Sequence, residues 1–276
     1  MNQIGFMQGR LSPIEKGKIQ AFPWEHWQSE FEIAQNLGFE LMEWTIDQER
    51  LDENPLMTQH GRQQISQLCS QYTITIRSLT GDCFMQAPFW KSEGSQRRVL
   101  LEQMAEVLIA AASLEIDYVV VPLVDNGSLE NQQQIDNFYQ GLETIRPILR
   151  DGKLKMVFES DFPPVELLEL ISSLERKYFG INYDIGNSAA LGYDPALEIA
   201  TYSSHIGNVH VKDRLLGGTT VPLGKGNANL PLVFKLLKEA NYPGQYILQT
   251  ARAVDDDHAG VLCSYRDLVK QLIANA

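Results

Sequence analysis

The sequence predicts an α/β protein, a single (β/α)8 TIM barrel over residues 1–276. Short apolar, β-branched runs alternate with polar turns and segments of helical period, which is the pattern of parallel βαβ units. Eight such runs are present, and a chain of 276 residues with 44% hydrophobic residues has about the size of one such barrel. No GxGxxG follows the first run, which disfavours the alternative of a doubly wound open sheet.

The eight expected strands are short and rich in Val, Ile, Leu and aromatic residues. They cover residues 4–7, 41–45, 73–79, 118–124, 154–159, 180–184, 206–211 and 246–249.

Between these strands, apolar residues recur at helical spacing in three segments, residues 31–37, 100–111 and 135–149. Two further helices carry start signals. One follows Asp194, which is an expected N-cap before a proline, and another begins at Val165 after two prolines. Each expected strand is thus followed by a segment suited to a helix.

Composition and charge exclude several classes of function. The net charge of -12 repels a nucleic-acid backbone, so we expect no nucleic-acid partner. No apolar run approaches the roughly 18 residues that span a membrane, and residues 1–6 lack the pattern of an export signal. Three cysteines without a CxxC spacing suit a reducing compartment. We therefore expect a cytoplasmic protein without a membrane partner.

Four late strands end in a polar residue after an apolar run. These residues are Glu159, Asp184, His210 and Gln249, and His210 is the one histidine of the five that lies inside an expected strand. In a TIM barrel, the carboxyl ends of the strands converge at one mouth, where the chemistry takes place. The sequence therefore predicts a cluster of three oxygen ligands and one nitrogen ligand, in which His210 binds a metal.

Other polar residues near strand ends are candidates for substrate contact. Arg10 and Arg252 follow the first and last strands, Glu43 is a charge inside an apolar strand, and Lys212 and Asp213 follow His210.

A glycine-rich loop follows the seventh strand. It spans residues 216–227 and includes Lys225. Glycine N–H groups at this place in a barrel often bind phosphate, although a flexible lid is an equal alternative for such a loop.

Four stretches resemble the sugar phosphate isomerase/epimerase family of xylose isomerase-like TIM barrels. They are IGFMQGR at 4–10, INYDIGN at 181–187, VHVKD at 209–213 and PLGKG at 222–226. The second and third are most similar to the pentulose 5-phosphate 3-epimerase branch. The resemblance implies a small-molecule sugar or sugar phosphate as the partner, and it places Asn187 among the substrate-binding residues.

The resemblance also implies a divalent metal, held by Glu, Asp, His and a second Glu from strands five to eight. The first three match Glu159, Asp184 and His210, but Gln249 stands where the second Glu is expected. Two carboxylates and a neutral imidazole balance the charge of M²⁺, where a third carboxylate would leave an excess of -1. We therefore expect a weakly bound Mn²⁺, Mg²⁺, Co²⁺ or Zn²⁺, with the carbonyl oxygen of Gln249 as the fourth ligand.

In related epimerases, the metal stabilises an enediolate and the two Glu residues transfer protons on opposite faces of C3. An amide cannot take up a proton at ordinary pH, so Gln249 favours a one-face aldose–ketose shift with Glu159 as the base. If Asp213, Glu43 or Asp82 replaces the missing carboxylate, 3-epimerisation becomes feasible.

Other classes of function remain as alternatives. One is a sugar-binding or regulatory barrel that lost turnover with the fourth carboxylate, and another is lyase or dehydratase chemistry on the same enediolate. An endonuclease-like barrel suits neither the five histidines nor the charge. The oligomeric state stays open, with a homo-oligomer as one alternative.

Overall fold

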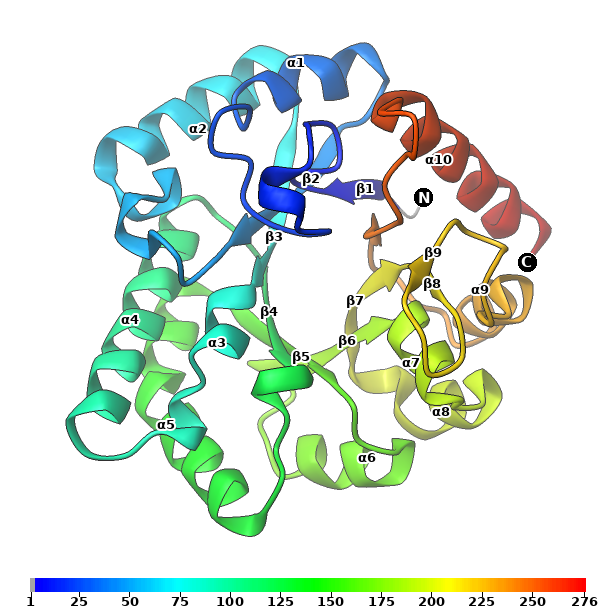
Figure 1. The fold of residues 1–276 in the computed structure, drawn as a ribbon. Coiled ribbons are helices and arrows are strands. Elements are labelled where there is room, and N and C mark those ends of the chain that lie inside the picture. Colours follow the sequence, from blue (N-terminus) through cyan, green and yellow to red (C-terminus); the bar gives the residue numbers. More distant parts are fainter. Residues whose placement is uncertain (1–2) are drawn as a thin grey trace.

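The computed structural model describes residues 3–276 and forms a closed barrel of eight parallel strands. The strand order is β1-β10-β7-β6-β5-β4-β3-β2, and helices surround the strands in an outer ring (Figure 1). The predicted fold class is thus confirmed. Residues 1 and 2, which are part of the stretch examined for an export signal, lie outside the described residues.

The barrel strands agree with the predicted ones to within two residues at each end. They are β1 (Ile4–Met7), β2 (Leu41–Ile46), β3 (Thr75–Gly81), β4 (Tyr118–Leu123), β5 (Lys155–Ser160), β6 (Phe179–Asp184), β7 (Ile206–Val211) and β10 (Tyr246–Leu248). The largest shift concerns β3. Thr73 adopts a left-handed conformation and ends the preceding helix, so the strand begins only at Thr75.

The helices that cover the barrel include the five for which the sequence carried signals. The full set of α-helices in the described residues is α1 (Ser29–Asn36), α2 (Gln59–Tyr72), α3 (Asp82–Gln86), α4 (Gly94–Ser113), α5 (Gln132–Gly152), α6 (Pro164–Ser172), α7 (Ile185–Leu191), α8 (Pro195–Tyr202), α9 (Leu230–Glu239) and α10 (His258–Asn275). Asp194 caps α8 as expected, because its side chain accepts a hydrogen bond from the backbone N–H of Ala196 at 2.9 Å. No helix over residues 3–276 is long and apolar enough to cross a membrane.

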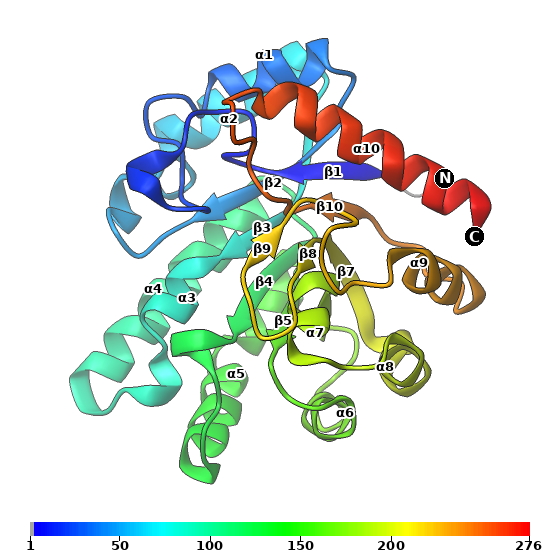
Figure 2. The same cartoon turned by 45° about the vertical axis from the view of Figure 1, so that its right-hand side comes forward.

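A two-stranded antiparallel ribbon interrupts the β/α repeat after β7. It consists of β8 (Asp213–Arg214) and β9 (Thr220–Val221), and it packs beside α7 near the carboxyl ends of β6 and β7 (Figures 1 and 2). The glycine-rich segment that the sequence predicted as a loop therefore contains a short hairpin.

Two β-bulges shift the strand register inside the barrel. One lies between Met42 and Glu43 where β2 pairs with β3, and the other between Ile181 and Asn182 where β6 pairs with β7. A bulge changes the direction in which the following side chains point, and bulges are common beside active sites. Both bulges directly precede residues of the polar cluster described below.

The long loop between β1 and α1 is fixed by a buried carboxylate. Glu30, in α1, is fully buried and accepts hydrogen bonds from the backbone N–H groups of Gly9 and Leu11, each at 2.9 Å. Burial raises the pKa of Glu30 to about 7, although these hydrogen bonds oppose the shift. The loop that carries Arg10 and Gln20 over the barrel mouth is therefore tied to the helix that follows it.

Replacing Glu30 by Ala should destabilise the fold, because two buried backbone donors lose their acceptor. We expect the free energy of unfolding to fall by about 2 kcal/mol or more. Glu32→Ala, on the exposed face of the same helix, is the control and should change stability by less than about 0.5 kcal/mol. Equal urea midpoints for the two variants would show that the carboxylate does not hold the loop.

Candidate active site

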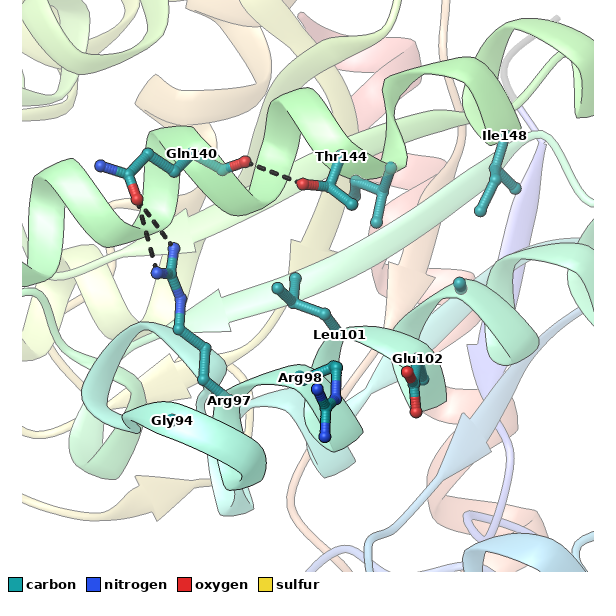
Figure 3. Close-up of a pocket in the computed structure, with 10 residues that line it drawn as sticks. Gly94, Arg97, Arg98, Leu101, Glu102, Gln140, Thr144 and Ile148 are labelled. Atoms are coloured by element: carbon teal, nitrogen blue, oxygen red, sulfur yellow. Dashed lines mark hydrogen bonds between the residues drawn. The ribbon is translucent and has the colours of Figure 1, made fainter.

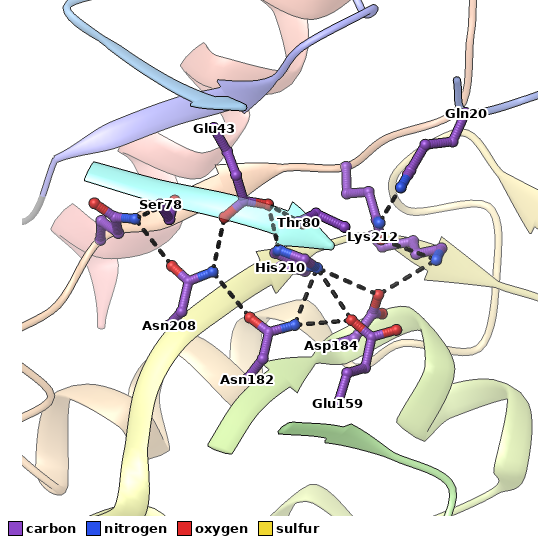
Figure 4. Close-up of polar contacts among 12 residues, drawn as sticks. Gln20, Glu43, Ser78, Thr80, Glu159, Asn182, Asp184, Asn208, His210 and Lys212 are labelled. Atoms are coloured by element: carbon purple, nitrogen blue, oxygen red, sulfur yellow. Dashed lines mark hydrogen bonds and ion pairs between the residues drawn. The ribbon is translucent and has the colours of Figure 1, made fainter. Parts of the chain in front are cut away.

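Three of the four strand-end residues come together at the mouth of the barrel. Glu159 is the last residue but one of β5, Asp184 ends β6 and His210 lies in β7. One potential ligand atom from each lies within 4.8 Å of the others (Figure 4). Nδ1 of His210 is 3.2 Å from Oε2 of Glu159 and 3.9 Å from Oδ2 of Asp184. All three side chains are buried.

Gln249, directly after β10, contacts a cation. Nζ of Lys212 donates to Oε1 of Gln249 at 2.9 Å and lies 3.3 Å from Oδ2 of Asp184. The side chain of Lys212 is only 14% exposed. The Lys212 ammonium therefore lies between Asp184 and Gln249, the position at which the resemblance implies a second Glu. A Glu there would repel Asp184, whereas the ammonium attracts it.

Glu43 lies beneath His210 rather than at the mouth. Its Oε1 atom is 2.7 Å from Nε2 of His210 and 2.6 Å from the hydroxyl of Thr80, and its Oε2 atom accepts from Asn208 at 3.0 Å. Both Glu43 and His210 have 0% exposure. This differs from the expected substrate contact, because β2 buries the carboxylate inside the barrel, where its partner is the imidazole.

A polar layer that sequence reasoning missed surrounds this pair (Figure 4). Asn182 donates to Oε2 of Glu159 at 2.8 Å, and Asn208 donates to the carbonyl oxygen of Asn182 at 2.9 Å. Each Asn lies two residues before a strand-end residue on the same strand, so its side chain points to the same face. That spacing is a signal in the sequence that could have identified both residues.

Burial and charge compete over the protonation of the cluster. Burial alone would lower the pKa of His210, but the charges and hydrogen bonds of Glu43 and Glu159 raise it to about 10. Burial would raise the pKa of each of these two glutamates, yet His210 holds both below the ordinary value. Burial does raise the pKa of Asp184, although the Lys212 ammonium opposes the shift. The cluster thus favours an ionised Glu159.

Asn187, in the first turn of α7, fixes Glu159 from the other side. Its amide group donates to Oε1 of Glu159 at 2.5 Å, while its carbonyl oxygen accepts from Arg214 at 2.8 Å. The backbone N–H of Asn187 donates to Asp184 at 2.8 Å. Asn187 therefore positions two carboxylates of the site. Arg214, from the β8–β9 ribbon, is a further residue that sequence reasoning missed.

The two arginines expected to reach the substrate are engaged by the protein itself. Arg10 donates to the backbone oxygens of Thr250 and Ile19 at 3.0 and 3.2 Å, and Arg252 donates to those of Gly9 and Ser12. Both cations hold the β1–α1 loop against the segment that follows β10. Both cations thus anchor loops, and their contact with a substrate stays a prediction.

Asp213 and the glycine-rich loop also differ from expectation. Asp213 is fully buried, and its carboxylate accepts from the backbone N–H groups of Gly224, Gly226 and Ala228 at 2.9 to 3.0 Å. These amides are the donors that the sequence suggested for a phosphate, so the loop already binds an internal anion. Lys225, between the two glycines, is exposed to solvent.

The residues present fit a divalent metal. Glu43 occupies Nε2 of His210 and directs Nδ1 towards Glu159 and Asp184, which is the usual carboxylate–histidine arrangement behind a metal ligand. Two carboxylates and one imidazole suit Mn²⁺, Mg²⁺, Co²⁺ or Zn²⁺. The Lys212 ammonium opposes a second cation at the same place.

Elsewhere, a groove of about 520 Å³ runs between α4 and α5 on the outer surface (Figure 3). Its lining includes Arg97, Arg98, Leu101 and Thr144, and the helices that form it lie outside the barrel strands. The candidate chemistry therefore lies at the barrel mouth rather than in this groove.

The fold and the site define a TIM barrel with an acidic, histidine-containing cluster at its mouth. A sequence profile described as xylose isomerase-like TIM barrel matches residues 31–263, and the chain belongs to this family. It is 26% identical over 265 residues to L-ribulose-5-phosphate 3-epimerase UlaE of Escherichia coli, with 91% of this chain and 92% of that protein covered.

Solved structures share the fold across nearly the whole chain. D-psicose 3-epimerase from Clostridium cellulolyticum H10 matches with a TM-score of 0.77 at 10% identity, covering 99% of both chains. A xylose isomerase-like TIM barrel protein from Mycobacterium smegmatis, in complex with magnesium, matches with a TM-score of 0.71 at 14% identity, covering 100% of this chain and 98% of that one.

Lys212 and Gln249 should both weaken metal binding. An ammonium a few Å from a divalent ion opposes it by a few kcal/mol at an effective dielectric constant of about 20, so Lys212→Met should tighten Mn²⁺ binding roughly 10-fold or more. Gln249→Glu should also tighten it, and more strongly in the Lys212→Met background, because Lys212 would otherwise neutralise the new carboxylate. Calorimetric titration checks this, with the exposed Lys225→Met as control. Equal affinities for all forms would contradict it.

Glu43 should act on the metal through His210. Glu43→Gln removes the charge behind the imidazole while keeping the size of the side chain, and we expect Mn²⁺ affinity to fall about 10- to 100-fold. Glu40→Gln, exposed just before the same strand, should leave the affinity unchanged. If Glu43→Gln binds Mn²⁺ as tightly as the native chain, the pair has no part in metal binding.

Proposed function

We propose that this protein is a divalent-metal-dependent isomerase or epimerase of a ketose or a ketose phosphate. One observation carries the proposal: Glu159, Asp184 and His210 bring potential ligand atoms within 4.8 Å of one another at the mouth of the barrel. The similarity over 91% of the chain to a 3-epimerase of a sugar phosphate supports it. The substrate is a small sugar, and three free cysteines suit a reducing, cytoplasmic setting.

In this proposal Glu159, Asp184, His210 and Gln249 hold the metal. When bound, the cation would supply a Lewis acid for negative charge that develops on the substrate oxygens. Its affinity is expected to be low, because a neutral amide and the Lys212 ammonium stand where a carboxylate would add charge.

Glu159 is the proposed base. Its two carboxylate oxygens accept hydrogen bonds from Asn187 and Asn182, which fix the carboxylate plane. His210, Lys212 and Asn182 hold the pKa of Glu159 below its ordinary value despite burial. With the metal bound, His210 would be neutral and the charge of the metal would act in its place, so the carboxylate is ready to accept a proton from a carbon next to the carbonyl group.

Lys212 is proposed to bind substrate oxygen. Its ammonium group lies at the cluster, held by Asp184 and Gln249, and can donate a further hydrogen bond because an ammonium has three donors. A sugar oxygen that gains negative charge during proton removal would strengthen this bond.

The pairing of Lys212 with Gln249 also favours a second candidate function, a sugar-binding or regulatory barrel without turnover. In that case the internal cation has replaced the metal, and the site binds sugar without deprotonating it. Turnover assays with added Mn²⁺ separate the two functions.

Glu159→Gln should abolish turnover. We expect a loss of at least 100-fold for any ketose that the native chain converts in a screen of free and phosphorylated pentuloses and hexuloses, because the amide cannot accept the proton. Running the native reaction in D₂O identifies the reaction type: deuterium at C1 or C2 means an aldose–ketose shift, and deuterium at C3 means 3-epimerisation.

The control for this variant is Glu166→Gln, an exposed glutamate shortly after the same strand, which should keep native activity. If the Mn²⁺-loaded native chain binds a sugar but neither converts it nor exchanges its carbon-bound hydrogen, the binding function replaces the enzymatic one.

A further inference from the structure

One buried carboxyl group at the barrel mouth has no part in the function proposed above. Asp82 directly follows β3 and opens α3, and its side chain is 7% exposed. In the strand order of the barrel, β3 is four strands from β7 in either direction, so Asp82 lies across the mouth from the strand that carries His210. β3 is two strands from β5, which carries Glu159, so the two carboxyl groups enter the mouth from different strands.

A single side chain connects Asp82 to the position of the missing carboxylate. Gln20, from the β1–α1 loop, donates through its amide nitrogen to Oδ2 of Asp82 at 2.5 Å, and its carbonyl oxygen accepts from Gln249 at 2.9 Å. Figure 4 shows Gln20 reaching towards Lys212 and the cluster. Gln20 thus links Asp82 to Gln249, the position at which the family resemblance implies a second Glu.

The second oxygen of this carboxyl group is available. Within residues 3–276, one hydrogen bond, from Gln20, reaches Oδ2 of Asp82 and none reaches Oδ1. The other two carboxylates considered as replacements are engaged elsewhere, Glu43 by His210 and Asp213 by three backbone amides. Asp82 is therefore the one of the three that keeps a free oxygen at the mouth.

The surroundings of Asp82 raise its pKa far above that of an ordinary carboxyl group. Burial and the negative charge of Asp47 raise its pKa to about 7, and Glu159 adds to the shift, while Gln20 and Lys212 oppose it. The charged or titratable groups that act on it from neighbouring elements are Asp47, Glu159, Lys212 and Arg10, and the thiol of Cys83 follows it in α3. A carboxyl group that titrates near neutral pH can both donate and accept a proton.

We propose that Asp82 is the second catalytic acid–base group of the site, and that the reaction is consequently 3-epimerisation of a ketose. This inference rests on the proposed function. Glu159 removes the proton from C3, and the electron pair of that C–H bond forms the C2–C3 double bond while the carbonyl oxygen takes the charge. Oδ1 of Asp82 then donates its proton to the opposite face of C3, and the C2 carbonyl re-forms.

The proton balance of this step has a consequence for turnover. Each conversion leaves Glu159 protonated and Asp82 ionised, so both must exchange a proton with water before the next conversion in the same direction. Conversion of the opposite epimer restores them without such exchange, because Asp82 is then the base and Glu159 the acid.

Asp82→Asn tests the assignment. Asn keeps the size of the side chain and an acceptor for Gln20, but it cannot transfer a proton, so we expect epimerisation to slow at least about 100-fold while Mn²⁺ affinity stays unchanged. Asp125→Asn, an exposed Asp after the neighbouring strand β4, is the matched control and should keep native rates.

Exchange in D₂O separates a chemical defect from a folding defect. In Asp82→Asn, the epimer whose C3 hydrogen faces Glu159 should still exchange it for deuterium, since Glu159 can remove and return a proton on its own face. The other epimer should exchange at least about 100-fold more slowly than with the native chain. A misfolded variant would lose exchange with both epimers and would fail to bind Mn²⁺.

The pH profile adds a further readout. In the direction in which Asp82 donates, kcat/KM of the native chain should fall as pH rises through about 7, because the acid is lost. The residual activity of Asp82→Asn should lack this decrease.

Three results would overturn the inference. Native rates in Asp82→Asn, loss of exchange with both epimers in a folded variant that binds Mn²⁺, or deuterium from the native reaction only at C1 or C2 would each exclude Asp82 as the second acid. The last result would leave the proposed sugar isomerase intact. Absence of turnover and exchange in the native chain with every ketose tested would instead reject the proposed function, and the inference with it.

Discussion

The pairing of Glu43 with His210 inside the barrel is the interaction on which the rest of the site depends. Both side chains are completely buried, and moving charges out of water costs several kcal/mol unless hydrogen bonds compensate. Thr80 and Asn208 supply that compensation for the carboxylate. Because the pair fixes the imidazole plane, the second ring nitrogen faces Glu159 and Asp184, so the geometry at the mouth follows from a pair one layer below it.

The loops above this layer are held by charged groups that bind the protein's own backbone. Arg10 and Arg252 donate to carbonyl groups on both sides of the mouth, and Glu30 accepts from two amides of the same loop. These contacts bring Gln20 over the site. Arg10 and Arg252, which the sequence suggested for substrate binding, thus stabilise the loops. The uncharged Gln20 makes the contact across the mouth.

The fold and the centre of the site were predictable from the sequence because they depend on local patterns. Each strand is a short apolar run, and a polar residue at its end must lie at the mouth of a parallel barrel, which placed Glu159, Asp184 and His210. The roles of Glu43 and Asp213 were not predictable, since their partners come from other strands and from a folded loop. Gln20 was missed for the same reason, because no periodicity marks a residue in a long loop.

The carboxylate of Asp213 gives the loop after β7 a property that matters for redesign. Three backbone amides, from Gly224, Gly226 and Ala228, converge on this one side chain. Converging amides of this kind form a nest that accepts an anion from any source. The loop is thus an anion-binding site that the carboxylate of Asp213 already fills. Replacing Asp213 by a shorter residue would free the three amides without rebuilding the backbone. The loop is therefore a starting point for engineering recognition of an external anion.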